Sequence, residues 1–165
     1  MDHLWTPWRY PYISRHATES GQPAECVFCA AAACANDRDA LVVHRGKYNF
    51  VIVNLFPYAS GHVMVVPYLH VPSLLDLADA TLTETILLAR QCEEKLRALY
   101  RPDGLNLGIN IGRSAGAGVA SHLHLHVLPR WHGDANFMTV VGETRILPED
   151  ISQTWERLHA AFETP

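Results

Sequence analysis

The stretch Ser121-His-Leu-His-Leu-His-Val-Leu-Pro-Arg130 decides how this sequence folds, because histidine and aliphatic residues alternate in it. Alternation of this kind is typical of a β-strand with one face in the core. His122, His124 and His126 are therefore predicted to project from one face, with successive side chains about 6.6–6.8 Å apart. The aliphatic residues between them are predicted to fill the core. Histidine is not among the residues enriched in strands, so something polar is expected to meet this face.

Three interpretations of the histidine face are open on these residues alone. The first is a solvated surface that happens to be rich in histidine. The second is a metal site, because imidazole is a common zinc ligand, although the outer two rings lie far apart for one ion. The third is nucleophilic catalysis, in which a neutral imidazole attacks phosphorus and forms a covalent intermediate.

The glycine-rich segment Gly112–Gly118, directly before the histidines, favours the catalytic interpretation. Backbone amides in such a segment can form an anion-binding nest, so Gly116 and Gly118 are predicted to contact phosphate. The segment lacks the Gly-Lys-Ser/Thr ending of a P-loop. A phosphate-containing ligand is therefore expected beside the three imidazoles.

Further strands are predicted in the apolar runs 40–44, 48–55 and 61–67 and in the alternating run 105–111. A short additional strand is predicted over 137–142. The connections between successive strands are too short for parallel crossovers, so the sheet is predicted to be largely antiparallel. The fold class is α+β, because one main helix interrupts the strands.

Two helices are predicted from apolar spacing. The longer follows a capping box in which Thr81 is the N-cap and Glu84 reaches back to its amide. Its core face is predicted to contain Leu82, Ile86, Ala89, Cys92, Leu96 and Leu99. The second helix follows Pro148 and is predicted to bury Ile151, Trp155, Leu158 and Phe162.

Composition excludes several classes of protein. The chain has 165 residues, 48% of them hydrophobic and 18% charged, which fits one globular domain with tails. Its formal net charge of −4 argues against binding of a nucleic acid polymer by bulk charge. No uncharged and continuously apolar stretch is long enough to span a membrane, and residues 1–9 do not have the pattern of a signal peptide. A cytoplasmic protein is expected.

In the cytoplasm the four cysteines are expected to be reduced, so they are predicted to be metal ligands or core residues rather than disulfides. Cys26-Val-Phe-Cys29 has the spacing at which two thiolates bind one ion. A redox dithiol is the alternative, but no thioredoxin-like helix start surrounds the pair. Cys92 is predicted to lie in the core.

The segment from His122 to Arg130 resembles the motif of the histidine triad family, in which three histidines alternate with apolar residues. The upstream segments 54–62 and 65–70 are similar to the first half of that family's domain. The resemblance runs from about residue 25 to residue 142. Segments 4–9 and 129–137 resemble a bacterial branch that includes diadenosine tetraphosphate phosphorylases.

The resemblance implies a five-stranded sheet, a homodimer that joins two such sheets, and hydrolysis or transfer at the α-phosphate of a nucleotide. By position, His124 corresponds to the nucleophile that forms a nucleotidyl-histidine. His126 corresponds to the residue that hydrogen-bonds the phosphate and assists the leaving group. Asn54 corresponds to a ribose-binding asparagine, and Asn110 to a polar residue near the phosphates. His62 is either a hydrogen-bonding residue of the site or a structural histidine.

The sequence departs from the family before the triad, where many members have a glutamine followed by Ser or Thr. Residues 116–121 contain no glutamine, and Ser121 is the candidate to replace its contact. Hydrolysis and phosphorolysis are therefore both open. Some members of the family bind zinc with two cysteines and two histidines, and the corresponding positions here are Cys26, Cys29, His70 and His122.

The predicted organisation is an aromatic N-terminal arm over residues 1–25, a histidine triad domain over 26–142 and a C-terminal helical extension over 143–165. The expected function is cleavage of dinucleoside polyphosphates, with an adenine nucleotide as the expected ligand. Zinc is the expected structural metal, and magnesium is considered as an ion that binds together with the substrate. The alternatives are a nucleoside phosphoramidase and a non-catalytic protein that binds nucleotide or zinc.

Overall fold

The computed structural model describes residues 26–134 and 149–164. The predicted arm over 1–25 and the predicted strand over 137–142 lie outside the described residues. The sheet has five strands in the order β1-β2-β3-β5-β4, and every neighbouring pair is antiparallel. The strands are β1 (Val42–Arg45), β2 (Asn49–Val53), β3 (Val63–Pro67), β4 (Gly104–Ile109) and β5 (Leu125–Arg130). The predicted α+β fold with a five-stranded antiparallel sheet is confirmed.

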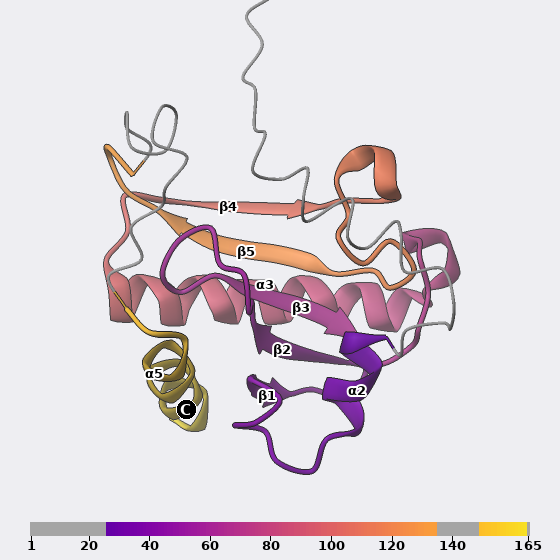
Figure 1. Cartoon of the computed structure of the whole chain (residues 1–165), viewed down its shortest axis with the longest axis horizontal. Helices are drawn as coiled ribbons and strands as arrows, with labels where there is room; N and C mark the ends of the chain where they lie inside the picture. The colour runs from indigo at the N-terminus through magenta and orange to yellow at the C-terminus, as the bar shows by residue number, and fades with distance from the viewer. Residues whose placement is uncertain (1–25, 135–148, 165) are drawn as a thin grey trace, which may run out of the picture.

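Helices cover both faces of this sheet (Figure 1). The long helix α3 (Asp79–Tyr100) runs behind the strands, and α5 (Ile151–Glu163) packs beside it against β1. The short helix α2 (Val27–Ala33) lies in front. Two single-turn 3-10 helices, η1 (Leu74–Asp76) and η2 (Arg113–Ala115), lie in the connections. None of the described helices is both long enough and apolar enough to cross a membrane.

The core has one apolar layer on each side of the sheet. On the α3 side, Val51 and Val53 of β2 pack with Leu96 and Leu158 of the helices. On the α2 side, the alternate residue Phe50 packs with the helix residue Phe28. Strands β2 and β3 are buried along their whole length because both of their faces are covered. That explains why both strands are apolar apart from Asn49, whereas a strand with one solvent-exposed face would alternate.

The prediction that the triad lies wholly within a strand is wrong in part. Strand β5 begins at Leu125, so only His126 of the three histidines is in regular pairing with β3 and β4. Before Leu125 the chain leaves the ladder, and the amide of Leu123 donates to the carbonyl of Val71 instead. His122, Leu123 and His124 are all buried, so the strict in-and-out alternation holds only from Leu125 onward.

The predicted capping box of the long helix is also wrong. Helix α3 begins at Asp79, and its N-cap Ala78 has no side-chain hydrogen bond. The carboxylate of Glu84 instead accepts hydrogen bonds from three successive backbone amides, those of Lys47, Tyr48 and Asn49. These amides lie at the turn into β2, so Glu84 holds a remote loop rather than its own helix end.

The predicted core face of α3 is correct at three positions and shifted at another. Ala89, Cys92 and Leu96 are buried, whereas Ile86 is 63% exposed. Thr85 takes the buried position in place of Ile86, and its hydroxyl donates to the side chain of Asn49. Leu88 is also buried. The polar contact with Asn49 is a tertiary feature that apolar spacing does not reveal.

We expect Glu84→Ala to lower the free energy of unfolding by about 2–4 kcal/mol, because four donors would lose one charged acceptor. The fourth donor is the side chain of Asn49, which is fully buried. Burial opposes the ionisation of Glu84, but the hydrogen bonds outweigh it and hold the pKa of this carboxyl below its ordinary value. Its stabilising effect is therefore present above the unfolded pKa and is lost as the pH falls through the folded one.

Urea denaturation at neutral pH measures this loss. The matched control is Glu94→Ala on the exposed side of the same helix, which should change the stability by less than about 0.5 kcal/mol. Equal effects of the two substitutions would contradict the role assigned to Glu84.

Candidate functional site

His124 is held in the tautomer of a nucleophile. Its ring is 4% exposed, and its Nδ1 lies 2.8 Å from the backbone carbonyl oxygen of His122. A carbonyl can only accept, so Nδ1 carries the proton and the lone pair of the neutral ring is on Nε2. Burial lowers the pKa of His124 below the ordinary imidazole value, and the hydrogen bond to His122 opposes that shift only in part. Near neutral pH the ring is therefore uncharged and nucleophilic at Nε2.

His126 is held in the opposite arrangement by a chain of hydrogen bonds. The backbone N–H of Tyr58 donates to Nδ1 of His62, so the proton of His62 is on Nε2. That Nε2 lies 3.0 Å from Nδ1 of His126 and donates to it. The proton of neutral His126 is consequently on Nε2. The rings of His124 and His126 meet edge to face, with centroids 4.9 Å apart, so a lone pair and an N–H donor are adjacent.

His62 is joined by hydrogen bonds to His126 and to the loop before it. Its side chain is fully buried, and the amide nitrogen of Asn54 lies 3.3 Å from its Nδ1. The other end of the Asn54 amide, Oδ1, accepts the backbone N–H of Phe56. Asn54 is thus next to His62, which in turn contacts His126.

Gly61 has a backbone conformation and a close packing that favour glycine, directly before His62. Its φ is +78°, which a residue with a side chain rarely adopts. A Cβ at this position would lie 3.0 Å from Leu96 Cδ2 and 3.1 Å from Tyr100 Cε2. The glycine therefore allows the loop that ends at His62 to pass close against α3.

The glycine-rich connection between β4 and β5 forms internal backbone hydrogen bonds that the sequence does not predict. The amide of Gly116 donates to the carbonyl of Arg113, and those of Ala115 and Ala117 donate to the carbonyl of Gly112. The Gly116 amide, for which the sequence predicts a phosphate contact, is hydrogen-bonded within the connection itself in this structure. The remaining predicted residues of this connection are Asn110, Gly118 and Ser121, of which Gly118 and Ser121 are exposed.

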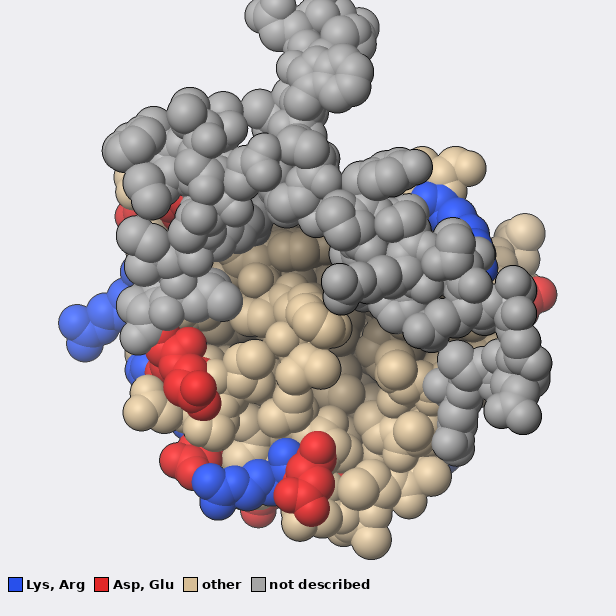
Figure 2. Space-filling model, viewed as in Figure 1, with Lys and Arg blue, Asp and Glu red and all other residues tan. Residues whose placement is uncertain are grey.

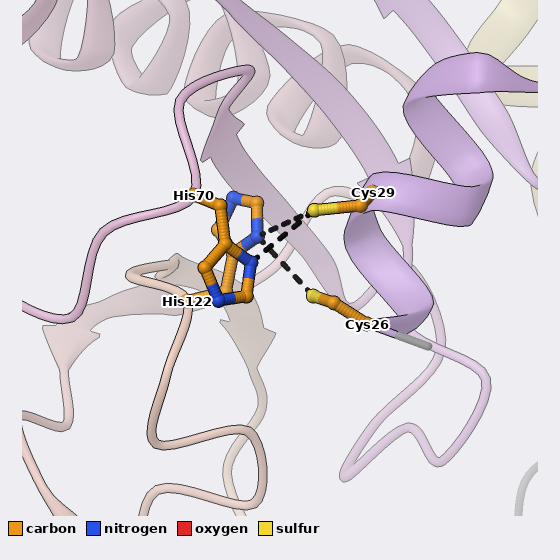
Figure 3. A group of neighbouring side chains, drawn as sticks. All are labelled: Cys26, Cys29, His70 and His122. Carbon is orange, nitrogen blue, oxygen red and sulfur yellow. Dashed lines mark hydrogen bonds between the residues drawn. The ribbon is translucent and has the colours of Figure 1, made fainter. Parts of the chain in front are cut away.

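A second cluster of side chains includes the ring of His122 (Figure 3). It consists of the Sγ atoms of Cys26 and Cys29 and the ring nitrogens of His70 and His122, which all lie within 4.8 Å of one another. Nδ1 of His122 is 3.3 Å from Cys26 Sγ and 3.6 Å from Cys29 Sγ, and Nδ1 of His70 is 3.2 Å from Cys29 Sγ. The predicted set of two cysteines and two histidines is brought together and could hold a metal ion.

The chemistry of these donors fits zinc. Tetrahedral zinc with N and S ligands requires ligand atoms roughly 3.3–3.8 Å apart, and the three measured distances are close to this range. Nε2 of His122 lies 2.8 Å from the carbonyl oxygen of Pro67 and donates to it, which leaves the lone pair of Nδ1 directed at the thiols. Burial lowers the pKa of His122, which also favours the neutral form that a metal binds.

His122, for which the sequence predicts both a catalytic and a metal-binding role, lies between the two clusters. Its ring faces the thiols, and its backbone carbonyl accepts the hydrogen bond of the His124 ring. His122 is therefore shared between the two clusters, with its side chain in one and its main chain in the other. Of the remaining cysteines, Cys92 is in the core as predicted, where burial raises the pKa of its thiol to about 12.

Arg45 was not identified from the sequence, yet it fixes the helix that carries the cysteines. Its guanidinium donates to the carbonyls of Ala32 and Cys34 at the end of α2 and to the carboxylate of Asp37. A seven-residue helix needs such support, because short helices are marginal by themselves. An arginine at the end of a strand has no sequence pattern that would indicate this role.

The front face of the molecule carries few charges at its centre. Figure 2 shows the described Lys, Arg, Asp and Glu residues of this view toward the rim, while the visible central surface is uncharged.

Comparison with known proteins agrees with this geometry. The HIT domain family model matches residues 35–133. A protein of Mycobacterium tuberculosis named AP-4-A phosphorylase is 39% identical over 159 residues, which are 93% of this chain and 80% of that protein. An asymmetrical bis(5'-nucleosyl)-tetraphosphatase of Schizosaccharomyces pombe is 36% identical over 93 residues, covering 56% of this chain and 50% of that protein.

Solved structures show the same fold. A zinc-bound histidine triad family protein from Mycobacterium smegmatis is 27% identical with a TM-score of 0.67, and the match covers 84% of this chain and 94% of that one. A histidine triad nucleotide-binding protein from Sulfolobus tokodaii gives a TM-score of 0.66 at 27% identity, over 84% and 92% of the two chains. By sequence and by structure, this chain belongs to the histidine triad (HIT) family.

Proposed function

We propose that this protein cleaves dinucleoside polyphosphates such as diadenosine tetraphosphate at the α-phosphate, through a covalent nucleotidyl intermediate on His124. The observation that carries the proposal is the pair of tautomers, with a lone pair on His124 Nε2 beside an N–H donor on His126. The names of two relatives, an AP-4-A phosphorylase and an asymmetrical tetraphosphatase, support the same substrate class.

The first step is attack by His124 Nε2 on the α-phosphorus. A P–N bond forms and the P–O bond to the rest of the polyphosphate breaks, so the leaving group departs as a nucleotide anion. His126 donates its Nε2–H to the charge that develops on the phosphate oxygens. The carbonyl of His122 meanwhile stabilises the positive charge on the His124 ring, because it accepts the Nδ1–H.

The second step transfers the nucleotidyl group to an acceptor. Water or inorganic phosphate attacks phosphorus, the P–N bond breaks, and the neutral imidazole of His124 is restored when the acceptor's proton is released. Asn54, Asn110, Gly118 and Ser121 are proposed to contact the nucleotide, the last in place of the glutamine that is missing from the loop. Both water and inorganic phosphate are proposed as acceptors, since residues 116–121 contain no glutamine to position water.

We further propose that the cluster of Cys26, Cys29, His70 and His122 binds zinc as a structural metal. Its donor set and spacing support this, as does the zinc-bound relative from Mycobacterium smegmatis. When bound, the ion would supply a cross-link between the start of α2 and the chain just before β5, without taking part in the reaction.

A homodimer is proposed through β4. This strand lies at one edge of the sheet, and Leu107 on it and Ile111 just beyond it are 49% and 46% exposed. Apolar residues on an open edge strand favour pairing with another copy. A cytoplasmic location is proposed with it, since reduced thiols are required for the cysteine cluster.

Product analysis tests the proposed activity. The purified protein is incubated with diadenosine tetraphosphate, with and without inorganic phosphate and magnesium, and the nucleotides are separated. AMP plus ATP would identify hydrolysis, and ADP plus ATP would identify phosphorolysis. The absence of turnover together with efficient cleavage of a nucleoside phosphoramidate would overturn the substrate class, and binding without any turnover would overturn the enzyme proposal.

The pH dependence of the reaction follows from the buried state of His124. The reaction needs the neutral ring, and burial lowers the pKa of His124 below 6.5. Activity should therefore persist through pH 6.5 and fall only as the pH drops through the lowered pKa. The acid limb of kcat/KM against pH measures this value. A midpoint above 6.5, or a flat profile down to pH 4, would contradict the assignment.

A further inference from the structure

We infer that Phe28 is a positioning residue for the nucleophile and couples the Cys26–Cys29–His70–His122 cluster to it. Phe28 is 4% exposed on α2, and its ring centroid lies 5.0 Å from that of His124 and 5.4 Å from that of His122. It is thus in contact with both the nucleophilic ring and the adjacent ring of the cluster. The inference rests on the proposed function of His124.

The contact supplies an orientation that the hydrogen bond alone does not. His124 is held at Nδ1 by one bond to the carbonyl of His122, and a ring held at one atom can still tilt about that bond. Phe28 packs on this ring at 45°, and His126 meets it edge to face at 78°. With these two neighbours the direction of the Nε2 lone pair is restricted, and in-line attack depends on that direction.

The position of Phe28 also links it to the thiols. It lies between Cys26 and Cys29 at the start of α2, and both sulfur atoms approach Nδ1 of His122. Arg45 holds only the C-terminal end of this short helix. The N-terminal end depends on the cysteine contacts and on the packing of Phe28, so a change at the thiols moves the ring that rests on His124.

A matched pair of substitutions tests the positioning role. Phe28→Leu removes the ring but keeps an apolar side chain, and Phe50→Leu makes the same change in the same apolar cluster. Phe50 is fully buried, and its recorded ring contact is with Tyr68 rather than with a histidine. Phe28→Met provides a second, unbranched replacement should the leucine variant not fold.

The readout is the rate of nucleotidyl-enzyme formation in a single turnover, measured by acid quench with labelled diadenosine tetraphosphate. We expect Phe28→Leu or Phe28→Met to lower this rate about 10-fold, with KM changed less than about twofold. Phe50→Leu should lower the melting temperature by a similar amount and leave the rate near that of the wild type. An equal loss of rate in the Phe28 and Phe50 variants, or a wild-type rate in the Phe28 variants, would overturn the inference.

The coupling to the cluster has a spectroscopic readout that does not need turnover. The imidazole 15N and 1H resonances of His124, assigned by their absence in His124→Ala, are recorded before and after removal of zinc with a chelator. We expect zinc removal to shift these resonances in the wild type and in Phe50→Leu, and by less than half as much in Phe28→Leu. No shift in the wild type, or an equal shift in Phe28→Leu, would overturn the coupling.

The two proposals fail in different ways. If the wild-type protein forms no nucleotidyl-enzyme, the proposed function is wrong, while the NMR comparison still decides whether Phe28 positions His124. If the wild type forms it and the Phe28 variants form it equally fast, only the inference about Phe28 is wrong.

Discussion

Replacing His124 with alanine is expected to lower kcat for diadenosine tetraphosphate by at least about 10⁴-fold, because the group that bonds to phosphorus is removed. Neither of the other two rings of the triad has the same geometry. The side chain of His122 faces the thiols, and His126 has its proton on Nε2 and offers a donor rather than a lone pair. Water would have to attack directly, without the covalent step.

Steady-state assays and a trap for the labelled nucleotidyl-enzyme measure the effect. The control is His132→Ala, since His132 is an exposed histidine whose ring pairs with Asp103 at the end of the sheet. That substitution should leave kcat within about twofold. A His124→Ala enzyme with more than about one hundredth of the wild-type rate, or with a stable nucleotidyl adduct, would disprove the assignment of the nucleophile.

The second large effect is expected from loss of the cysteine pair. Replacing Cys26 and Cys29 with serine should abolish zinc binding and lower the free energy of unfolding by about 3–5 kcal/mol, comparable to loss of a covalent cross-link. For a domain of this size that corresponds to a fall in the melting temperature of roughly 10 °C. The reason is that the cluster joins three segments far apart in the chain, at residues 26–29, 70 and 122.

Metal analysis and calorimetry, each with and without a chelator, measure this change. Cys34→Ser is the matched control, because Cys34 contacts the carbonyl of Asn36 and lies outside the cluster. It should retain both zinc and the melting temperature. A wild-type protein that contains no zinc and does not respond to added zinc would refute the metal site, whereas the prediction for His124 would stand.

Much of the fold was predictable because local patterns agree with it. The runs that form β2 and β3 are apolar apart from Asn49, and both strands are buried on both faces. The C-terminal helix has the predicted residues Trp155 and Leu158 in the core, and its N-cap Asp150 accepts from the amide of Ser152. These features depend on residues close together in the chain, so spacing alone identifies them.

The errors occurred where a distant segment competes with a local pattern. Thr81 and Glu84 have the spacing of a capping box, but three amides at the turn before β2 bind the carboxylate instead. The alternation of the triad predicts a strand from His122, but pairing with β3 and β4 ends at Leu125. In both cases partners more than 15 residues away supply hydrogen bonds that the sequence does not reveal.

The sequence by itself determined which side chains are available for chemistry: three alternating histidines, a pair of cysteines three residues apart, and Asn54 and His62 upstream. Only the tertiary structure decided what each ring does. A single backbone carbonyl places the lone pair of His124 on Nε2, and a backbone N–H at Tyr58, relayed through His62, places the proton of His126 on Nε2. Imidazole is both donor and acceptor, so its role is set by the partner at its other nitrogen, and here those partners come from the main chain.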